Sequence, residues 1–274
     1  MINHNQIQKA ETFREQHLSE KLLLLANVWD TLSARLIATL GFPSIATASA
    51  AMALSNGYKD GENIPFKHLL NAVKQIVEAV DVPVTVDFER GFTDDISQLK
   101  EHIGLLIETG AVGLNIEDGK GHGKGLLSIE EQCKKIEAIR AVAVELNVPI
   151  VINARTDIYL QPYENNRIEK VIERANAYQA AGADAVYPIL IDNYKEISTL
   201  KEMTTLPINV FLLESIGNLK QLEELGVSRV SVGPAMINGA ITKMKQLAEG
   251  LLNYETHEFY SQKMVSNDFL DKLI

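Results

Sequence analysis

Cysteine is nearly absent from this chain of 274 residues, in which Cys133 is the only one. A single thiol excludes an intramolecular disulfide and any metal site built from several cysteines, and it favours a reducing compartment. The first twenty residues lack the apolar core of a signal peptide, and no apolar run is long enough to span a bilayer. We therefore expect a cytoplasmic protein.

Positive charge is scarce as well, because 26 Lys and Arg residues are outnumbered by 36 Asp and Glu residues, for a net charge of −10. The basic residues are scattered, which disfavours nucleic-acid and anionic-membrane partners, since both need a basic patch. The first expected turn, NVWDTLSA, lacks the GxGxxG pattern of doubly wound nucleotide-binding folds. A small-molecule partner is the remaining expectation.

The chain does contain short apolar runs that alternate with amphipathic stretches, a pattern typical of βα units around a parallel sheet. Helices are expected to end at Gly110, Gly182 and Gly226, each with a strand close behind. Eight such units without a linker predict an α/β fold, a single (β/α)8 barrel of TIM type over residues 1–274. The strand candidates are Leu22–Trp29, Pro43–Ala48, Val82–Phe88, Val112–Glu117, Pro149–Ala154, Ala183–Tyr187, Pro207–Phe211 and Ser228–Val232.

Residues 254–274 are surplus to such a barrel and are expected to form a helical tail. The tail is rich in large apolar side chains, namely Phe259, Tyr260, Met264, Phe269 and Leu270. An apolar face of this kind needs a surface to cover it. The tail therefore either folds back on its own barrel or packs on another subunit.

Acidic residues end several of the apolar runs, where a barrel places its catalytic groups. Asp87 and Glu89 are two residues apart and so share one side of a strand, and Glu117 ends the neighbouring strand. Three converging carboxylates with no nearby His or Cys predict a Mg2+ site. The alternative is that they cap helices or pair with Arg90 and Lys120.

Arg155 follows a buried run and could clamp a substrate carboxylate, or else form a salt bridge with Glu117 or Asp157. His122 lies in the glycine-rich segment GKGHGKG, as a lid residue or a plain exposed histidine. Cys133 is expected in the core rather than as a nucleophile.

These motifs resemble the isocitrate lyase and phosphoenolpyruvate mutase superfamily, in its methylisocitrate lyase-like and oxaloacetate decarboxylase-like branch. The likeness spans residues 22–252 and rests on NVWDTLSARLIATLGFPSIATASAAMA, NGYKDG, VDFERGF, IED, ARTD, AAGADAVYP and GVSRVSVGP, in this order. By this resemblance Asp87 binds Mg2+ (or Mn2+) directly, while Glu89 and Glu117 hold metal-bound waters. Arg155 is the implied clamp for the substrate carboxylate.

The resemblance also implies further substrate contacts. Asp60 matches the acid that contacts the reacting group, and Ser49 with Ala50 match the stretch whose amides receive the substrate carboxylate. Asn209 matches a substrate-side asparagine. In the resembled family the C-terminal helix crosses to a neighbouring subunit, which implies a homodimer or homotetramer formed by helix exchange.

The chain departs from the lyases of the family in one loop, where GKGHGKG replaces a KKCGH-type segment and its cysteine. His122 is then the candidate acid in its place. Members with mutase activity also tend to carry a histidine where this chain has Ile189.

The resemblance thus implies a Mg2+-dependent lyase or hydrolase that breaks a C–C (or C–P) bond beside a 2-oxo acid, through an enolate of pyruvate type. The alternatives are a Mg2+-dependent pyruvate aldolase and a non-catalytic barrel that binds keto acids.

Overall fold

The computed structural model describes residues 2, 4–121, 124–162, 165–261 and 264–274. Within these residues the strands are β1 (Leu23–Leu25), β2 (Asn27–Val28), β3 (Ile45–Thr47), β4 (Val84–Asp87), β5 (Gly113–Glu117), β6 (Val151–Thr156), β7 (Ala185–Pro188), β8 (Asn209–Phe211) and β9 (Arg229–Ser231). Each predicted strand overlaps one of these, although β6 and β7 run past the predicted ends at Ala154 and Tyr187. The first predicted strand is divided into β1 and β2 at Ala26.

All strand pairs are parallel and follow chain order around the barrel. One ladder runs β2-β3-β4-β5-β6-β7 and the other runs β1-β9-β8. The two sheets adjoin at Ala26, between β1 and β2, and at a single bridge between Val186 and Ile208. Strand pairing is therefore not continuous around the barrel. The predicted α/β barrel fold is confirmed.

Several of the helices that surround the strands begin at a residue whose side chain caps the helix. Asp30 caps the helix after β2, and Ser128 with Glu131 forms a capping box. The helices are α1 (His4–Leu18), α2 (Thr31–Thr39), α3 (Ser49–Ser55), α4 (Phe66–Glu78), α5 (Ile96–Glu108), α6 (Ile129–Glu145), α7 (Arg167–Ala180), α8 (Tyr194–Met203), α9 (Leu219–Glu224) and α10 (Ala235–Leu252). Short 3-10 turns occupy Ile158–Leu160 and Glu214–Ile216.

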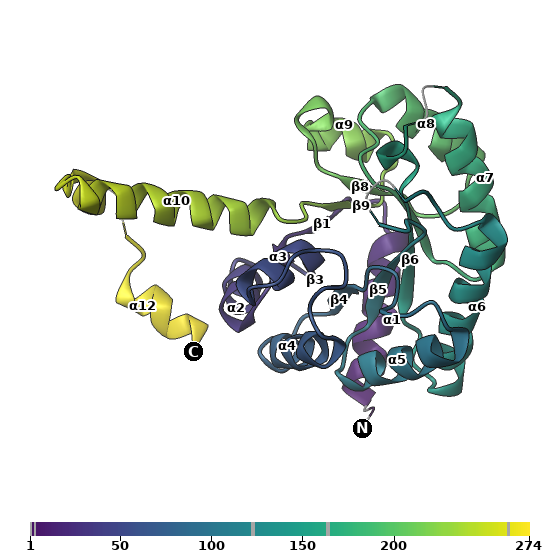
Figure 1. Ribbon diagram of the computed structural model, residues 1–274, viewed down its shortest axis with the longest axis horizontal. Helices are drawn as coiled ribbons and strands as arrows, with labels where there is room; N and C mark the ends of the chain where they lie inside the picture. The colour runs from purple at the N-terminus through teal and green to yellow at the C-terminus, as the bar shows by residue number, and fades with distance from the viewer. Residues whose placement is uncertain (1, 3, 122–123, 163–164, 262–263) are drawn as a thin grey trace.

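Helix α1 closes the end of the barrel at which the strands begin (Figure 1). Its Phe13 is fully buried and packs edge-on against His17, with ring centroids 4.6 Å apart. Gly113 makes room for this plug, because a Cβ at that position would lie 2.8 Å from the Phe13 ring. The bottom of the barrel is therefore filled by side chains from the N-terminal helix.

Helix α10 leaves the barrel as a long arm, and the chain then turns back toward α2 (Figure 1). Ile237 is its one buried residue among those described. After α10 come α11 (His257–Ser261), α12 (Asn267–Leu270) and a 3-10 turn (Asp271–Leu273), so the tail beyond 254 is two short helices. Arg35 Nη1 on α2 donates to the carbonyl of Leu273 at 2.9 Å. No helix among the described residues has the length and hydrophobicity to cross a membrane.

Candidate active site

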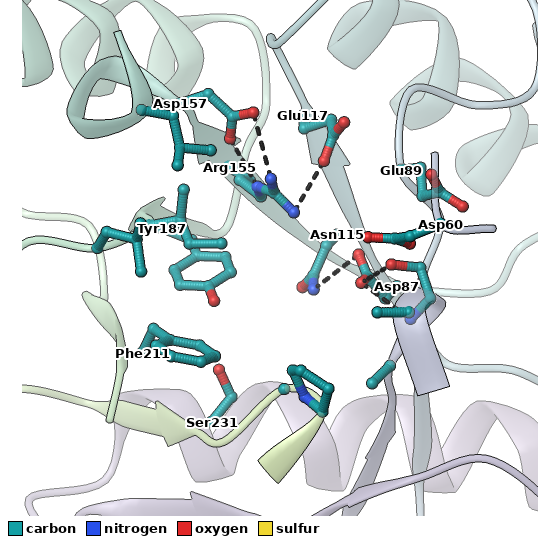
Figure 2. A pocket seen from close by; sticks show the side chains of 18 of the residues that line it. Asp60, Asp87, Glu89, Asn115, Glu117, Arg155, Asp157, Tyr187, Phe211 and Ser231 are labelled. Carbon is teal, nitrogen blue, oxygen red and sulfur yellow. Dashed lines mark hydrogen bonds and ion pairs between the residues drawn. The ribbon is translucent and has the colours of Figure 1, made fainter. Parts of the chain in front are cut away.

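A cavity of about 290 Å³ opens at the end of the barrel where the strands finish. This size suits a small metabolite, since pockets for larger organic ligands measure ~300–1,000 Å³. Charged residues that line it include Asp60, Asp87, Glu89, Glu117, Arg155 and Asp157 (Figure 2). Ser49 and Ala50 also line it, so the structure brings together most of the predicted site.

Strand register explains why these side chains meet. Glu117 on β5 is in register with Arg155 on β6, which is in register with Tyr187 on β7. Asp87 and Asn115 form the row below on β4 and β5. Because side chains alternate between the two faces of a strand, residues two apart point into the same cavity.

Arg155 is held by two carboxylates. Its Nη1 lies 2.8 Å from Glu117 Oε2, and its Nε and Nη2 lie 2.7 and 3.2 Å from the two oxygens of Asp157. The side chain is 15% exposed, which leaves one edge of the guanidinium open to the cavity. The salt-bridge interpretation of Arg155 therefore describes this structure, and a bound carboxylate would have to share or replace one of these partners.

Asp87 is fixed by hydrogen bonds with residues of three elements. Its Oδ2 accepts from Ser49 Oγ at 2.7 Å and from the Ser49 amide at 3.1 Å, at the start of α3. Asn115 Nδ2 lies 3.5 Å from the other carboxylate oxygen, and the Asp87 amide donates to Thr47 Oγ1 at 3.0 Å. The carboxylate is thus presented in one orientation at the edge of the cavity (Figure 2).

The loop that carries Asp60 is clamped to the loop that carries Glu89. The Glu62 amide donates to Glu89 Oε2 at 2.7 Å, and the Glu62 carboxylate accepts from the amides of Arg90 and Phe92 at 3.0 and 2.7 Å. Glu62 and Glu89 both have positive φ, at 61° and 49°, a conformation uncommon for residues other than glycine. Strained backbone of this kind gathers at functional sites.

Negative charge dominates the electrostatics of the cavity. Burial, followed by the nearby Asp87, Asp60 and Glu117, raises the pKa of Glu89 to about 9. Burial also raises the pKa of Glu117 well above its usual range, although Arg155 opposes the shift. Arg155, the one Lys or Arg among the described lining residues, pairs with Glu117 and Asp157, so the other acids retain a proton or require a cation.

These donors fit a hard divalent ion held partly through water. Every candidate ligand is a carboxylate oxygen, the donor that Mg2+ prefers. Among the described residues, no three His, Cys, Asp or Glu side chains lie close enough to bind one ion directly. That arrangement agrees with one direct ligand, Asp87, and with acids that act through water, because Mg2+ usually keeps several waters.

Beneath the cavity lies a buried polar layer that includes Asn209. Arg229 on β9 is 1% exposed, and its Nη2 lies 3.3 Å from Asn115 Oδ1. Asn153 Nδ2 donates to the same oxygen at 2.8 Å, which turns the Asn115 amide group toward Asp87. Asn209 is fully buried near Ser231 and does not line the cavity.

Other candidates take structural roles or fall outside the site. Asp30 caps α2, and Cys133 is half-buried against the core, as expected. The amide of Gly233, before α10, donates to Asn27 Oδ1 at 2.9 Å. His122 lies outside the described residues.

The sequence profile of the phosphoenolpyruvate phosphomutase family matches residues 13–252. The chain belongs to this family. The 2-methylisocitrate lyase of Halalkalibacterium halodurans is 30% identical over 211 residues, which cover 74% of this chain and 67% of that protein. An oxaloacetate decarboxylase of Pseudomonas fluorescens SBW25 is 28% identical over 253 residues, covering 88% of this chain and 83% of that enzyme.

Solved structures agree with the phosphomutase-family fold. A protein of Burkholderia cenocepacia J2315, described only as a candidate lyase or mutase, superimposes with a TM-score of 0.89 at 32% identity. The match covers 97% of this chain and 95% of that one. The family resemblance read from the motifs is therefore confirmed.

Several site residues of this phosphomutase-family chain escaped the sequence reasoning. Asn115 and Tyr187 line the cavity, as do Phe211 and Ser231 near the ends of β8 and β9. Strand alternation could have found Asn115, which lies two residues before Glu117. Glu62 carried no such signal, because its clamp joins two irregular loops.

Proposed function

We propose that this protein is a Mg2+-dependent carbon–carbon lyase that cleaves the bond beside a 2-oxo acid. The observation that supports this most is the group of Asp87, Glu89 and Glu117 at the mouth, with Arg155 beside it. Relatives named as 2-methylisocitrate lyase and oxaloacetate decarboxylase support the same proposal. Mn2+ is the expected substitute ion.

Each protein group has a defined task in this proposal. Asp87 would bind the ion directly, and Glu89 and Glu117 would hold its waters. A bound Mg2+ would polarise the 2-oxo group and stabilise the negative charge that develops as the neighbouring bond breaks. Arg155 would exchange part of its contact with Glu117 for the substrate carboxylate, which fixes the orientation of the bond to be cleaved.

The loop around Asp60 and the start of α3 supply the remaining contacts. Asp60 faces the cavity beside Asp87 and Glu89 (Figure 2), where it would move a proton to or from the reacting group. The amides of Ser49 and Ala50 would receive the substrate carboxylate, although the Ser49 amide here donates to Asp87. His122 is the proposed second acid.

The test is a panel assay of pyruvate release with Mg2+ from oxaloacetate, methylisocitrate, isocitrate, phosphonopyruvate and 4-hydroxy-2-oxo acids. We expect cleavage of oxaloacetate or a related branched 2-oxo acid, and little turnover of isocitrate. Asp60→Asn should lower kcat by ~10²–10⁴, the usual contribution of a general acid or base. Asp81→Asn, an exposed acid remote from the mouth, is the matched control.

Each alternative function has its own outcome in this assay. Release of pyruvate from 4-hydroxy-2-oxo acids alone would identify an aldolase. Tight binding of oxalate without turnover of any compound would identify a non-catalytic binding barrel.

We further propose that the arm beginning at α10 is exchanged between subunits of a dimer, two of which form a tetramer. Large side chains along α10 are exposed, including Met244 at 69% and Leu252 at 80%. Leu24 on β1 is 36% exposed, whereas strands of a complete barrel are covered by helices. Helices in proteins gain most of their stability from the packing of an apolar face, so a partner surface would stabilise α10.

Light scattering tests the exchange with three chains: the intact protein, one stopped at Tyr254 and one stopped at Gly233. We expect dimers or tetramers from the intact chain and loss of assembly when α10 is removed. A monomeric intact protein would contradict the exchange. An unchanged mass for the shortest chain would show that the arm does not hold the subunits together.

A further inference from the structure

The two acids that end the IED and ARTD motifs have no role in the function proposed above. Asp157 lines the cavity, whereas Asp118 is fully buried and does not line it. Side chains alternate along an extended chain, so Asp118 points away from the cavity that its neighbour Glu117 faces, into the helix layer. There its Oδ2 accepts from Arg174 Nη1 at 3.0 Å and from the Tyr178 hydroxyl at 2.7 Å, both on α7. A buried ion pair therefore lies behind the cavity wall.

The ion pair of Asp118 with Arg174 joins three segments of the chain. Arg174 Nη2 donates at 3.0 Å to the carbonyl of Leu127, at the end of the loop before α6. The Leu127 amide donates to the Asp118 carbonyl at 2.8 Å, and Asp118 Oδ1 accepts from the Asp157 amide at 2.9 Å. A buried ion pair gives little net stability compared with apolar side chains of similar volume. What this pair does supply is a fixed position for Asp157, just after β6.

Asp157 in turn holds one edge of the Arg155 guanidinium. Its carboxylate accepts from Nε at 2.7 Å and from Nη2 at 3.2 Å, a two-point contact that fixes the plane of the group (Figure 2). Nη1 is left outside this contact and lies 2.8 Å from Glu117 Oε2. Nη1 is thus the atom that a substrate carboxylate can share with Glu117 or take over from it.

Gly119 leaves the space that the Asp157 carboxylate occupies. A Cβ at residue 119 would overlap Oδ2 of Asp157 and would lie 3.0 and 3.3 Å from its Cγ and Cβ. The whole Asp157 side chain would therefore have to move, and not only its end. Gly119 has no positive φ, so the backbone itself would accept alanine there. Close packing against Asp157 is the reason that this position requires glycine.

We infer that Asp157 is a positioning residue for Arg155, held in place by the buried ion pair behind it and by the space at Gly119. Other acids of the mouth would attract a guanidinium that Asp157 had released. With Asp157 in place, Nη1 meets the substrate carboxylate in one orientation. The inference rests on the proposed function, which makes Arg155 the carboxylate clamp.

Gly119→Ala tests the inference while every charge of the site is retained. The added Cβ should displace the Asp157 carboxylate. Calorimetric titration with Mg2+ present should then show oxalate binding weakened by about tenfold or more, because the charged hydrogen bond that orients Arg155 is lost. Mn2+ alone, followed by its electron paramagnetic resonance, should bind with wild-type affinity, since Asp87 is untouched. Gly104→Ala on α5 is the control, because a Cβ there meets no other segment within 4 Å.

Removal of the buried ion pair gives a second test, in a double variant that combines Asp118→Leu with Arg174→Met. Apolar side chains of similar volume should keep the melting temperature near that of wild type. Oxalate binding should nevertheless weaken, because the Asp157 amide loses its acceptor. The control is Arg140→Met, which removes a cation paired with Asp184 just before β7, at the opposite end of the barrel. It should leave the oxalate affinity unchanged.

The outcomes separate the inference from the function on which it rests. A wild type that does not bind oxalate with Mg2+ refutes the metal site and the inference together. A wild type that binds it, with Gly119→Ala binding equally or more tightly, refutes the positioning role alone. Equal losses of Mn2+ and oxalate affinity in Gly119→Ala would also overturn that role, since they would indicate general damage to the site. The Gly119→Ala result decides the matter if the double variant does not fold.

Discussion

The two ends of the barrel differ in how they treat buried polar groups. At the bottom, Phe13 and His17 of α1 fill the space between the strands, and the His17 ring is neutral because burial lowers its pKa to about 3. At the mouth, acids are buried beside one another, and the pKa of Glu89 rises to about 9. The bottom is thus built for stability, whereas the mouth keeps an unfavourable charge distribution that a ligand can relieve.

This comparison predicts opposite responses to pH at the two ends. A group whose folded pKa is raised loses its stabilising contribution as the pH increases, and a group whose folded pKa is lowered loses it as the pH decreases. The metal-free mouth should therefore destabilise the protein at alkaline pH, and the bottom should do so at acidic pH.

The largest expected effect is a loss of stability when the Phe13 side chain is removed from the bottom of the barrel. Phe13→Ala should lower the free energy of unfolding by ~3–5 kcal/mol, because it leaves a cavity in a close-packed site. At ~2–4 °C per kcal/mol, the melting temperature should fall by roughly 10 °C. Leu18→Ala, on the same helix but 71% exposed, is the control and should have little effect. Loss of oxalate affinity in a folded Phe13→Ala protein would contradict the separation of the two ends.

A smaller effect is expected at the mouth, measured as melting temperature against pH in EDTA. The pKa of Glu89 rises from 4.5 to about 9 on folding, so the metal-free protein should lose several degrees across this interval. Glu89→Gln should reduce the loss of melting temperature at alkaline pH. The exposed control Glu101→Gln should leave that loss unchanged. Mg2+ should bind more tightly as the pH rises, because it displaces the proton. Parallel curves for wild type and Glu89→Gln would refute this account.

The smallest of these pH effects belongs to His17. Its pKa falls from 6.5 to about 3 on folding, so the native state loses stability as the pH decreases through this interval. His17→Gln should reduce this acid sensitivity, with His4→Gln, near the start of the same helix, as control. Circular dichroism melts at pH 4 and pH 7 measure the difference, and identical acid sensitivity in the two variants would contradict it.

Much of the fold followed from the sequence, because buried parallel strands are largely apolar and several helices end at a glycine that the sequence shows. The strand-end acids and Arg155 were found for a related reason: each is a charged residue at the end of an apolar run, where a strand reaches the mouth. Asp60 was identified only through the family resemblance. The division of the first strand at Ala26 and the departure of α10 from the barrel carry no such local signal, because both depend on which surfaces remain uncovered after packing.

Two features of the site could not be read from one sequence for a similar reason. Arg229 is the first residue of β9, so it does not stand at a strand end, yet it is buried and its Nη2 contacts Asn115. Glu62 fixes its loop through backbone amides, which every residue possesses. Both roles arise from distant segments brought together by the fold.

Calorimetric titration of oxalate in the presence and absence of Mg2+, on wild type and Asp87→Ala, tests the metal-dependent site most directly. The wild type should bind oxalate only with Mg2+, and saturation to 100 times Kd should stabilise it by ~2.7 kcal/mol. Asp87→Ala should abolish both the binding and the thermal shift, and Asp81→Asn should preserve them. A wild type that saturating oxalate and Mg2+ leave unchanged in melting temperature, or an Asp87→Ala protein that binds as well as wild type, would contradict the site described for this barrel.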